Sequence, residues 1–199
     1  ECVRRVAAGL MRLGVAAGDV VAYQLPNCWQ FGVLHLACVR IGAISNPLMP
    51  IFRQRELRFM LEFGEAKILV IPDRFRDFDY PSMVADIRSD LPQLEQVLVI
   101  DGKDENSFES HCLIPSSEDA TLQAGVYASR RPNADQVTQL LYTSGTTGQP
   151  KGVLHTGNTL LAAARSCITH LNLTAEEVIL MASPLAHQTG FVYVLVHFK

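Results

Sequence analysis

No stretch of this sequence is apolar for long enough to cross a lipid bilayer as a helix, which takes about 20 residues. The longest candidates, such as residues 68–71, have the length of a β-strand. A basic segment followed by an apolar leader, typical of a secretory signal, is also missing from the start of the sequence. Neither a membrane span nor a cleaved signal is therefore predicted.

An excess of positive charge is missing as well. The sequence has 17 Lys and Arg against 20 Asp and Glu, for a net charge of -3. Proteins that bind nucleic acid or membrane surfaces usually carry a basic surplus, so neither partner is predicted. Hydrophobic residues make up 48% and charged residues 19% of the chain, which is typical of a folded domain and argues against a disordered or collagen-like chain.

Cysteines at metal-binding or redox spacing are absent. The five cysteines are odd in number, and no Cys-x-x-Cys pair occurs among Cys2, Cys28, Cys38, Cys112 and Cys167. This pattern disfavours a disulfide framework and a zinc ribbon. We interpret the cysteines as small core residues of a reduced, cytoplasmic protein. No metal site built from residues of this chain is predicted.

What the sequence does contain is an alternation of helix-like and strand-like segments. Helices are predicted from apolar residues three and four apart over residues 3–11, 27–40, 54–63, 82–91 and 160–171. Strands are predicted from short apolar runs at 20–25, 67–71, 97–100, 137–142, 152–155 and 178–181. Because these runs are continuous rather than alternating, they are typical of a parallel sheet covered on both faces. The predicted fold class is α/β, with a mostly parallel sheet and helices on both faces.

The apolar pattern weakens between residues 101 and 135, where Gly, Asp, Asn, Pro and Ser become frequent. This composition is typical of turns and loops. Since regular apolar runs resume at 137, we interpret 101–135 as a surface excursion within one domain and not as a domain boundary.

The most informative segment is 142–153, which reads Tyr-Thr-Ser-Gly-Thr-Thr-Gly-Gln-Pro-Lys-Gly-Val. Gly145, Gly148 and Gly152 allow backbone conformations closed to other residues, so that several amide N–H groups can face one anion. The Thr and Ser hydroxyls add uncharged donors, and Lys151 adds one compact positive charge suited to phosphate oxygens. The segment is therefore predicted to hold a polyphosphate.

Other nucleotide-binding and catalytic motifs are absent. In the Walker P-loop the lysine follows glycine and precedes Ser or Thr, whereas here proline precedes Lys151 and Gly152 follows it. The patterns Gly-x-Gly-x-x-Gly, Gly-x-Ser-x-Gly and His-Glu-x-x-His do not occur, which argues against a Rossmann, α/β-hydrolase or zinc-protease site. The plain alternative is a solvated Ser/Thr/Gly linker, but linkers seldom place Pro-Lys-Gly between two apolar strands.

Residues 143–152 resemble the phosphate-loop signature of the adenylate-forming superfamily over all ten positions. Acyl-CoA synthetases, aryl-CoA ligases, luciferases and peptide-synthetase adenylation domains belong to this superfamily. A second segment, Ser183-Pro-Leu-Ala-His-Gln-Thr-Gly190, is similar to the family's Pro-x-x-His-x-x-Gly stretch. His187 takes the place of the family histidine beside the acyl pocket, although by itself it fits a histidine at a helix start. The residues in this segment and at Asn46-Pro47 are most similar to those of cyclohexanecarboxylate-CoA ligases and short-chain acyl-CoA synthetases.

The resemblance implies that residues 1–199 are part of the large N-terminal domain of an acetyl-CoA-synthetase-like fold, with the C-terminal domain outside the chain. It implies an AMP-forming ligase that activates a carboxylic acid as acyl-AMP, releases pyrophosphate and then forms a CoA thioester. ATP, Mg²⁺ and CoA are implied as ligands, and Lys151 and His187 as catalytic residues. The residues implied in ATP binding are Thr143, Ser144, Gly145, Thr146, Thr147, Gly148 and Lys151.

Three other functions stay open: an adenylation domain that loads a carrier protein, a phosphotransferase and a non-catalytic nucleotide-binding fragment. The family's adenine-contacting segment with its magnesium-binding glutamate, its ribose-binding aspartate, its hinge and its C-terminal lysine have no match within the 199 residues. This piece alone is therefore expected to be inactive. The sequence leaves the acyl group and the oligomeric state open, and a homo-oligomer is compatible with it.

Overall fold

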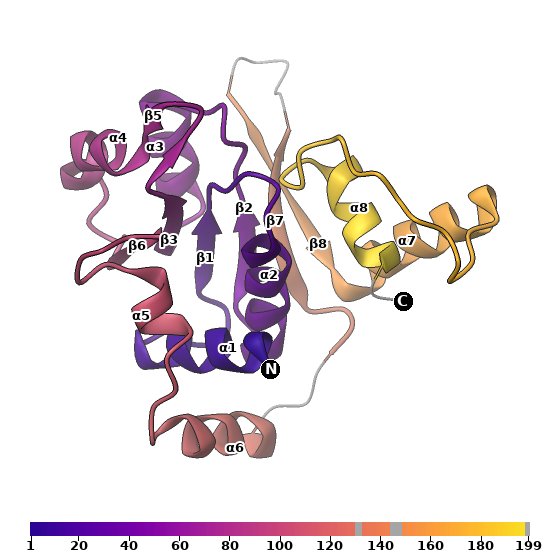
Figure 1. The fold of residues 1–199 in the computed structure, drawn as a ribbon, viewed down its shortest axis with the longest axis horizontal. Coiled ribbons are helices and arrows are strands. Elements are labelled where there is room, and N and C mark those ends of the chain that lie inside the picture. The colour runs from indigo at the N-terminus through magenta and orange to yellow at the C-terminus, as the bar shows by residue number, and fades with distance from the viewer. Residues whose placement is uncertain (130–132, 144–148, 198–199) are drawn as a thin grey trace.

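The computed structural model describes residues 1–129, 133–143 and 149–197, and its centre is a six-stranded sheet (Figure 1). The strand order is β6-β3-β1-β2-β7-β8. Neighbouring strands are parallel except β7 and β8, which are antiparallel. The strands span Val20–Tyr23 (β1), Ile44–Pro47 (β2), Ala66–Pro72 (β3), Gln96–Ile100 (β6), Val137–Thr143 (β7) and Lys151–Thr156 (β8).

Helices cover both faces of the sheet, as the sequence predicts. On one face the core includes residues of α1 (Cys2–Arg12), α2 (Trp29–Ile41), α5 (Phe108–Cys112) and α8 (Gln188–His197). On the other face it includes residues of α3 (Gln54–Phe63) and α4 (Tyr80–Ile87), after which a short 3-10 helix spans Arg88–Asp90. Successive side chains of the central strand β1 alternate between these cores, because Val21 and Tyr23 belong to the first and Ala22 to the second. The predicted α/β class with a mostly parallel, doubly covered sheet is confirmed.

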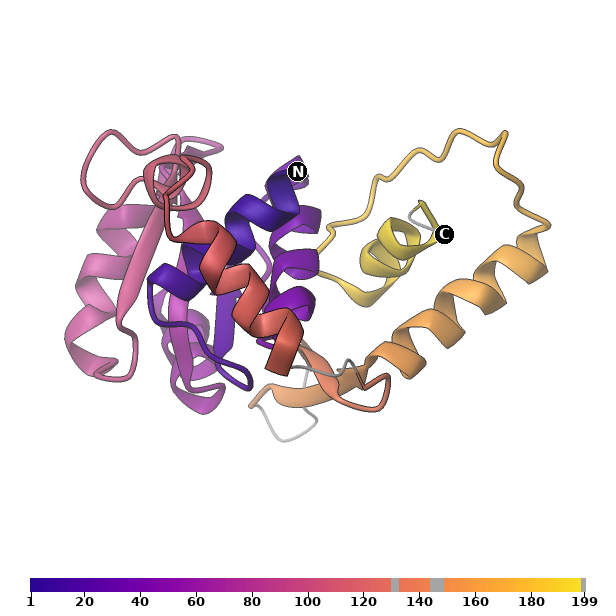
Figure 2. The same ribbon diagram turned by 90° about the horizontal axis from the view of Figure 1, so that it is seen from below.

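Smaller elements surround this frame. The hairpin of β4 (Arg74–Phe75) and β5 (Phe78–Asp79) precedes α4. Helix α6 (Asp119–Ser129) lies beside α1, where Arg12 forms an ion pair with Asp119 (Figures 1 and 2). Helix α7 (Gly157–Leu171) follows β8 and extends away from the sheet (Figure 2). No helix within the described ranges combines the length and the apolarity that a bilayer crossing needs.

The structure differs from the sequence-based prediction in several places, and α8 and the β4–β5 hairpin were also not predicted. Strand β2 was not predicted, because its residues Ser45 and Asn46 are polar although both are fully buried. The 101–135 segment contains α5 and α6, and Phe108 of α5 is fully buried in the core. The strand predicted at 178–181 is wrong: these residues form no strand, and Val178 and Leu180 are 99% and 90% exposed. An apolar run forms a strand only when a neighbouring strand completes its hydrogen bonds, and this run has none among the described residues.

Candidate functional site

The hairpin of β7 and β8 carries the predicted phosphate loop. Thr143, the last residue of β7, lies opposite Lys151, the first residue of β8. Directly opposite residues of an antiparallel pair have Cβ atoms about 5 Å apart, so the hydroxyl and the ammonium project from the same hairpin mouth. Both residues are exposed. The other predicted phosphate-binding residues lie outside the described part of the chain: Ser144, Gly145, Thr146, Thr147 and Gly148.

Gly152 has a different role from the one that the sequence suggests. It lies inside β8, paired with Tyr142, and it is not among the glycines with positive φ. A Cβ atom at this position would lie 3.1 Å from Leu140 Cδ1 and 3.2 Å from Phe63 Cε1. We conclude that Gly152 serves close packing against Phe63 and Leu140, and not a turn around an anion.

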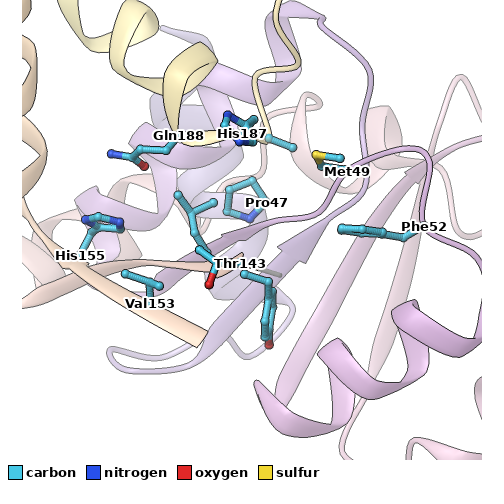
Figure 3. A pocket seen from close by; sticks show the side chains of 11 residues that line it. Pro47, Met49, Phe52, Thr143, Val153, His155, His187 and Gln188 are labelled. Carbon is cyan, nitrogen blue, oxygen red and sulfur yellow. The ribbon is translucent and has the colours of Figure 1, made fainter. Parts of the chain in front are cut away.

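A cavity of about 160 Å³ opens beside the hairpin mouth, at the carboxyl ends of β2 and β7 (Figure 3). Ligands of open α/β sheets bind characteristically at this edge, outside the carboxyl ends of the strands. Three segments far apart in the sequence supply the walls. The lining residues are Pro47, Met49 and Phe52 in and after β2, Leu141 to Thr143, Val153 and His155 on the hairpin, and Ala186 to Gln188 before and in α8.

The wall formed by Met49 and Phe52 is apolar and firmly held. Gln24 is fully buried, and its Nε2 donates to the carbonyl oxygens of Met49 and Phe52 at 2.9 and 3.0 Å. The Tyr80 hydroxyl donates to the carbonyl of Pro50 at 2.9 Å. These bonds fix the backbone of the loop, so its side chains are placed against the cavity before any ligand arrives.

The opposite wall carries His187, at the residue before α8. Its backbone N–H donates to the Pro184 carbonyl at 3.0 Å, and its Nδ1 accepts from the Thr189 N–H at 3.3 Å. That hydrogen bond occupies the Nδ1 lone pair and leaves Nε2 as the ring nitrogen open to a ligand. His187 thus lies at the start of α8, and its exposed ring also lines the cavity (Figure 3). Its place beside an acyl group stays a prediction.

The glycine that ends this motif allows a very close backbone approach. A Cβ atom on Gly190 would lie 2.2 Å from the Pro184 carbonyl oxygen and 2.8 Å from its carbonyl carbon. Such distances are far inside van der Waals contact. The spacing Pro-x-x-His-x-x-Gly thus folds residues 184–187 tightly onto the first turn of α8, with His187 at the corner.

His155 and Tyr142 are cavity residues that sequence analysis missed. His155 faces the cavity from β8 (Figure 3), and partial burial lowers its pKa, which favours the neutral imidazole. The Tyr142 hydroxyl donates to the Met60 carbonyl at 2.7 Å, and burial raises the pKa of Tyr142 to about 12. A signal for His155 was present, because alternate residues of a strand share a face, and His155 stands two residues after Val153 on the cavity side.

The site offers a ligand one ammonium, one threonine hydroxyl, two imidazoles and an apolar surface. Among the described residues, no group of three or more His, Cys, Asp or Glu side chains could hold a metal ion together.

Comparisons with known proteins agree with this arrangement. The family model described as AMP-binding enzyme matches residues 1–198. The medium-chain fatty-acid–CoA ligase of Escherichia coli is 36% identical over 190 residues, which are 92% of this chain and 32% of that protein. The 2,3-dihydroxybenzoate-AMP ligase of Bacillus subtilis is 30% identical over 183 residues, again 92% of this chain and 32% of the relative.

A similar fold is found among solved structures. The N-terminal domain of FACL13 from Mycobacterium tuberculosis superposes with a TM-score of 0.80 at 25% identity, over 98% of this chain and 45% of that one. Against the two ligases above, the chain spans about a third of their length.

Proposed function

This chain belongs to the AMP-binding enzyme family, and on that premise we propose that the whole protein is an ATP-dependent acyl-CoA ligase. The observation that carries the proposal is the placement of Thr143 and Lys151 at a hairpin mouth beside a largely apolar cavity. Phosphates and an organic acid could then meet where His187 faces the cavity (Figure 3). The chain would be part of the N-terminal domain, with the C-terminal domain outside it.

In the proposed first step, a carboxylate oxygen of the acid attacks the α-phosphorus of ATP. The bond from that phosphorus to the bridging oxygen breaks, and pyrophosphate leaves with the bonding electron pair. Lys151 and the hydroxyl and amide donors of 143–148 would hold the β- and γ-phosphates, which positions them and stabilises the charge on the departing pyrophosphate. Mg²⁺, as a hard cation, would supply further charge neutralisation at phosphate oxygens when bound with ATP.

In the proposed second step, the thiol of CoA attacks the acyl carbon of the acyl adenylate. The thiol gives up its proton, the acyl–oxygen bond breaks, and AMP leaves. His187 would border the acyl group from the α8 side while Met49 and Phe52 border it from the β2 side, so that the acyl carbon is held between two walls of the cavity.

The finer assignments are part of the proposal. The resemblance to cyclohexanecarboxylate-CoA ligases and short-chain acyl-CoA synthetases stays a prediction, because the relatives named above act, by their names, on a medium-chain fatty acid and on 2,3-dihydroxybenzoate. A reduced, cytoplasmic setting is supported by the cysteines, all five of which are free. We expect the 199-residue chain alone to be inactive, since it spans 32% of these relatives.

The test uses the full-length protein with ATP, MgCl₂ and a panel of acetate, octanoate, cyclohexanecarboxylate and benzoate. With at least one acid we expect pyrophosphate and enzyme-bound acyl-AMP, and when CoA is added we expect pyrophosphate, AMP and the thioester in equal amounts. Production of ADP rather than AMP would instead indicate a phosphotransferase. Failure to release pyrophosphate with any acid would favour a non-catalytic nucleotide-binding protein.

A second candidate function requires an additional assay with a different acyl acceptor. An adenylation domain that loads a carrier protein would perform the same first step, and the 2,3-dihydroxybenzoate-AMP ligase among the relatives is named for that step. Transfer of the acyl group to a phosphopantetheinylated carrier protein but not to free CoA would favour this candidate.

A further inference from the structure

The turn after β1 contacts the backbone behind two opposite walls of the cavity. Gln24 holds the Met49–Phe52 wall through its Nε2, as described above. Asn27, three residues further on, reaches the other wall. Its Nδ2 donates to the Ser183 carbonyl at 2.9 Å, and its Oδ1 accepts from the Leu185 N–H at 2.8 Å.

The two bonds of Asn27 connect residues 156 and 158 positions apart in the sequence. One planar amide supplies both the donor and the acceptor, so it fixes the position and the direction of the backbone at 183–185 together. Asp could accept from Leu185 but could not donate to Ser183 when ionised, and Ala could do neither. Asparagine is therefore suited to hold a backbone segment in one register, and we call its two hydrogen bonds to Ser183 and Leu185 the clamp.

The clamp matters because the chain before it is poorly anchored. Residues 173–183 contain no helix or strand, and Val178 and Leu180 are almost fully exposed. After the clamp, Ala186 belongs to the hydrophobic core, and Phe191 is fully buried with its ring centroid 4.6 Å from that of His35. His187 lies between these two fixed points.

Resting on the proposed ligase function, we propose that Asn27 is a positioning residue that holds His187 and the first turn of α8 against the cavity. Asn27 itself does not line the cavity, so it acts on the acid only through the 183–187 backbone. Together with Gln24 it lets the β1–α2 turn set the separation of the two walls. A displacement of about 1 Å in such a wall is enough to cost a large factor in rate.

The kinetic test compares Asn27→Ala and Asn27→Asp in the full-length enzyme. We expect kcat/KM for the acid to fall about tenfold or more, while KM for ATP stays within about twofold of the wild-type value. Asn27→Asp should share the defect, because a carboxylate oxygen would face the Ser183 carbonyl oxygen. Asn106→Ala, at an exposed asparagine far along the chain, is the matched control and should be unchanged.

Two results would overturn the proposal. One is wild-type kinetics in both Asn27 variants. The other is a uniform loss of active enzyme with unchanged KM for the acid, which indicates a folding defect. If Asn27 acts through His187, then Asn27→Ala combined with His187→Ala should be no worse than His187→Ala alone. Additive losses in that double variant would also contradict the proposal.

Hydrogen exchange separates failure of the clamp from failure of the ligase function. In Asn27→Ala, the amide of Leu185 loses its acceptor, so peptides covering 183–191 should exchange faster while those covering β7 keep their protection. This readout needs no activity. Unchanged protection at 183–191 would refute the clamp in an active enzyme, whereas faster exchange in a protein inactive toward every acid would refute the ligase proposal alone.

Discussion

The parallel half of the sheet and the hairpin side of the molecule are built in opposite ways. In β1 and β3, residues such as Val21, Leu69 and Val70 are fully buried between helices on both faces. From β8 onward, several apolar side chains are exposed: Leu154 is 61% and Val178 99% exposed. The first region contains most of the core, to which the second adds Leu160, Ala186 and Phe191, whereas the second carries most of the candidate site.

Several contacts join the two regions, among them the bond from the Tyr142 hydroxyl to the Met60 carbonyl and the packing of Gly152 against Phe63. Strand β7 pairs with β2 in parallel at Ser45 and Gln139. Asn27 holds the segment before His187, and Phe191 packs its ring against His35 of α2. Regions with few buried contacts open at lower free energy than the core. The contrast teaches that the core sets stability while these joining contacts set the geometry of the cavity.

The largest expected effect comes from Lys151→Ala, which separates chemistry from stability at the hairpin mouth. We expect the rate of acyl-AMP formation in the full-length protein to fall about 100- to 1000-fold, as for loss of one charge-stabilising group. The midpoint of thermal unfolding should stay close to wild type, because the side chain is exposed. Carboxylate-dependent pyrophosphate exchange and differential scanning calorimetry are the measurements.

Lys103→Ala, at another exposed lysine, is the control for Lys151 and should change neither quantity. An Arg at position 151 keeps the charge but not the compact ammonium, so its rate should lie between wild type and Ala. Full activity of Lys151→Ala would remove the main support for a phosphate-binding hairpin.

A smaller effect is expected from Gly190→Ala, which disturbs the site-bearing side while leaving the parallel core intact. The added methyl group would meet Pro184 backbone atoms at 2.2 and 2.8 Å. We expect a loss of about 1–3 kcal/mol in unfolding free energy, typical of overpacking. The kcat/KM for the acid should fall as well, because the turn that carries His187 must shift. Urea denaturation and steady-state kinetics measure the two effects.

Gly125→Ala is the matched control for Gly190, since an added Cβ there meets no atom within 4 Å and the residue lies in α6. Alanine is favoured over glycine in a helix by up to about 1 kcal/mol, so this control should be neutral or slightly stabilising. Equal behaviour of the two alanine variants would show that the close approach at Gly190 has no consequence.

The sequence predicts strands β1 and β3 of the parallel core for a physical reason. Doubly covered strands are continuous apolar runs, so β1 and β3 are visible without knowing their neighbours. Strand β2 is not recognised from the sequence because Ser45 is polar. The Ser45 hydroxyl can be buried only because it forms hydrogen bonds with the hydroxyl of Tyr23 at 2.8 Å and Nδ1 of His35 at 3.0 Å. At residues 178–181 the error is the opposite one: an apolar run was predicted as a strand, but it has no partner strand among the described residues.

The candidate site divides in the same way. Thr143 and Lys151 were predictable because one short loop places them together. Met49 comes from an element that only the strand order brings to the cavity, and spacing along the sequence carries no such information. The hydrogen bonds of Asn27 to Ser183 and Leu185 could be recognised only in the folded chain.

A pH dependence is also expected, at the joining contact of His35. This histidine is 4% exposed, and burial lowers its pKa to about 4. An unfolded histidine has a pKa near 6.5, so between pH 6.5 and 4 the unfolded chain binds a proton that the folded chain does not. Stability should therefore fall as the pH falls through this window, by up to about 1.4 kcal/mol per pH unit. Tyr23, the other titratable group in this hydrogen-bonded cluster, stays neutral there because burial raises its pKa.

Urea denaturation of the full-length protein from pH 7.5 to 4.5, with His35→Gln and His170→Gln, tests this link. His35→Gln should be less stable at pH 7.5 but should lose less stability toward pH 4.5, since it has no imidazole to charge. His170→Gln, at an exposed histidine of α7, should keep the wild-type slope. Because the His35 ring contacts Phe191, protection of the 188–195 amides should also decrease at acid pH in wild type more than in His35→Gln. Parallel pH profiles for all three proteins would show that protonation of His35 does not cause the loss of stability at acid pH.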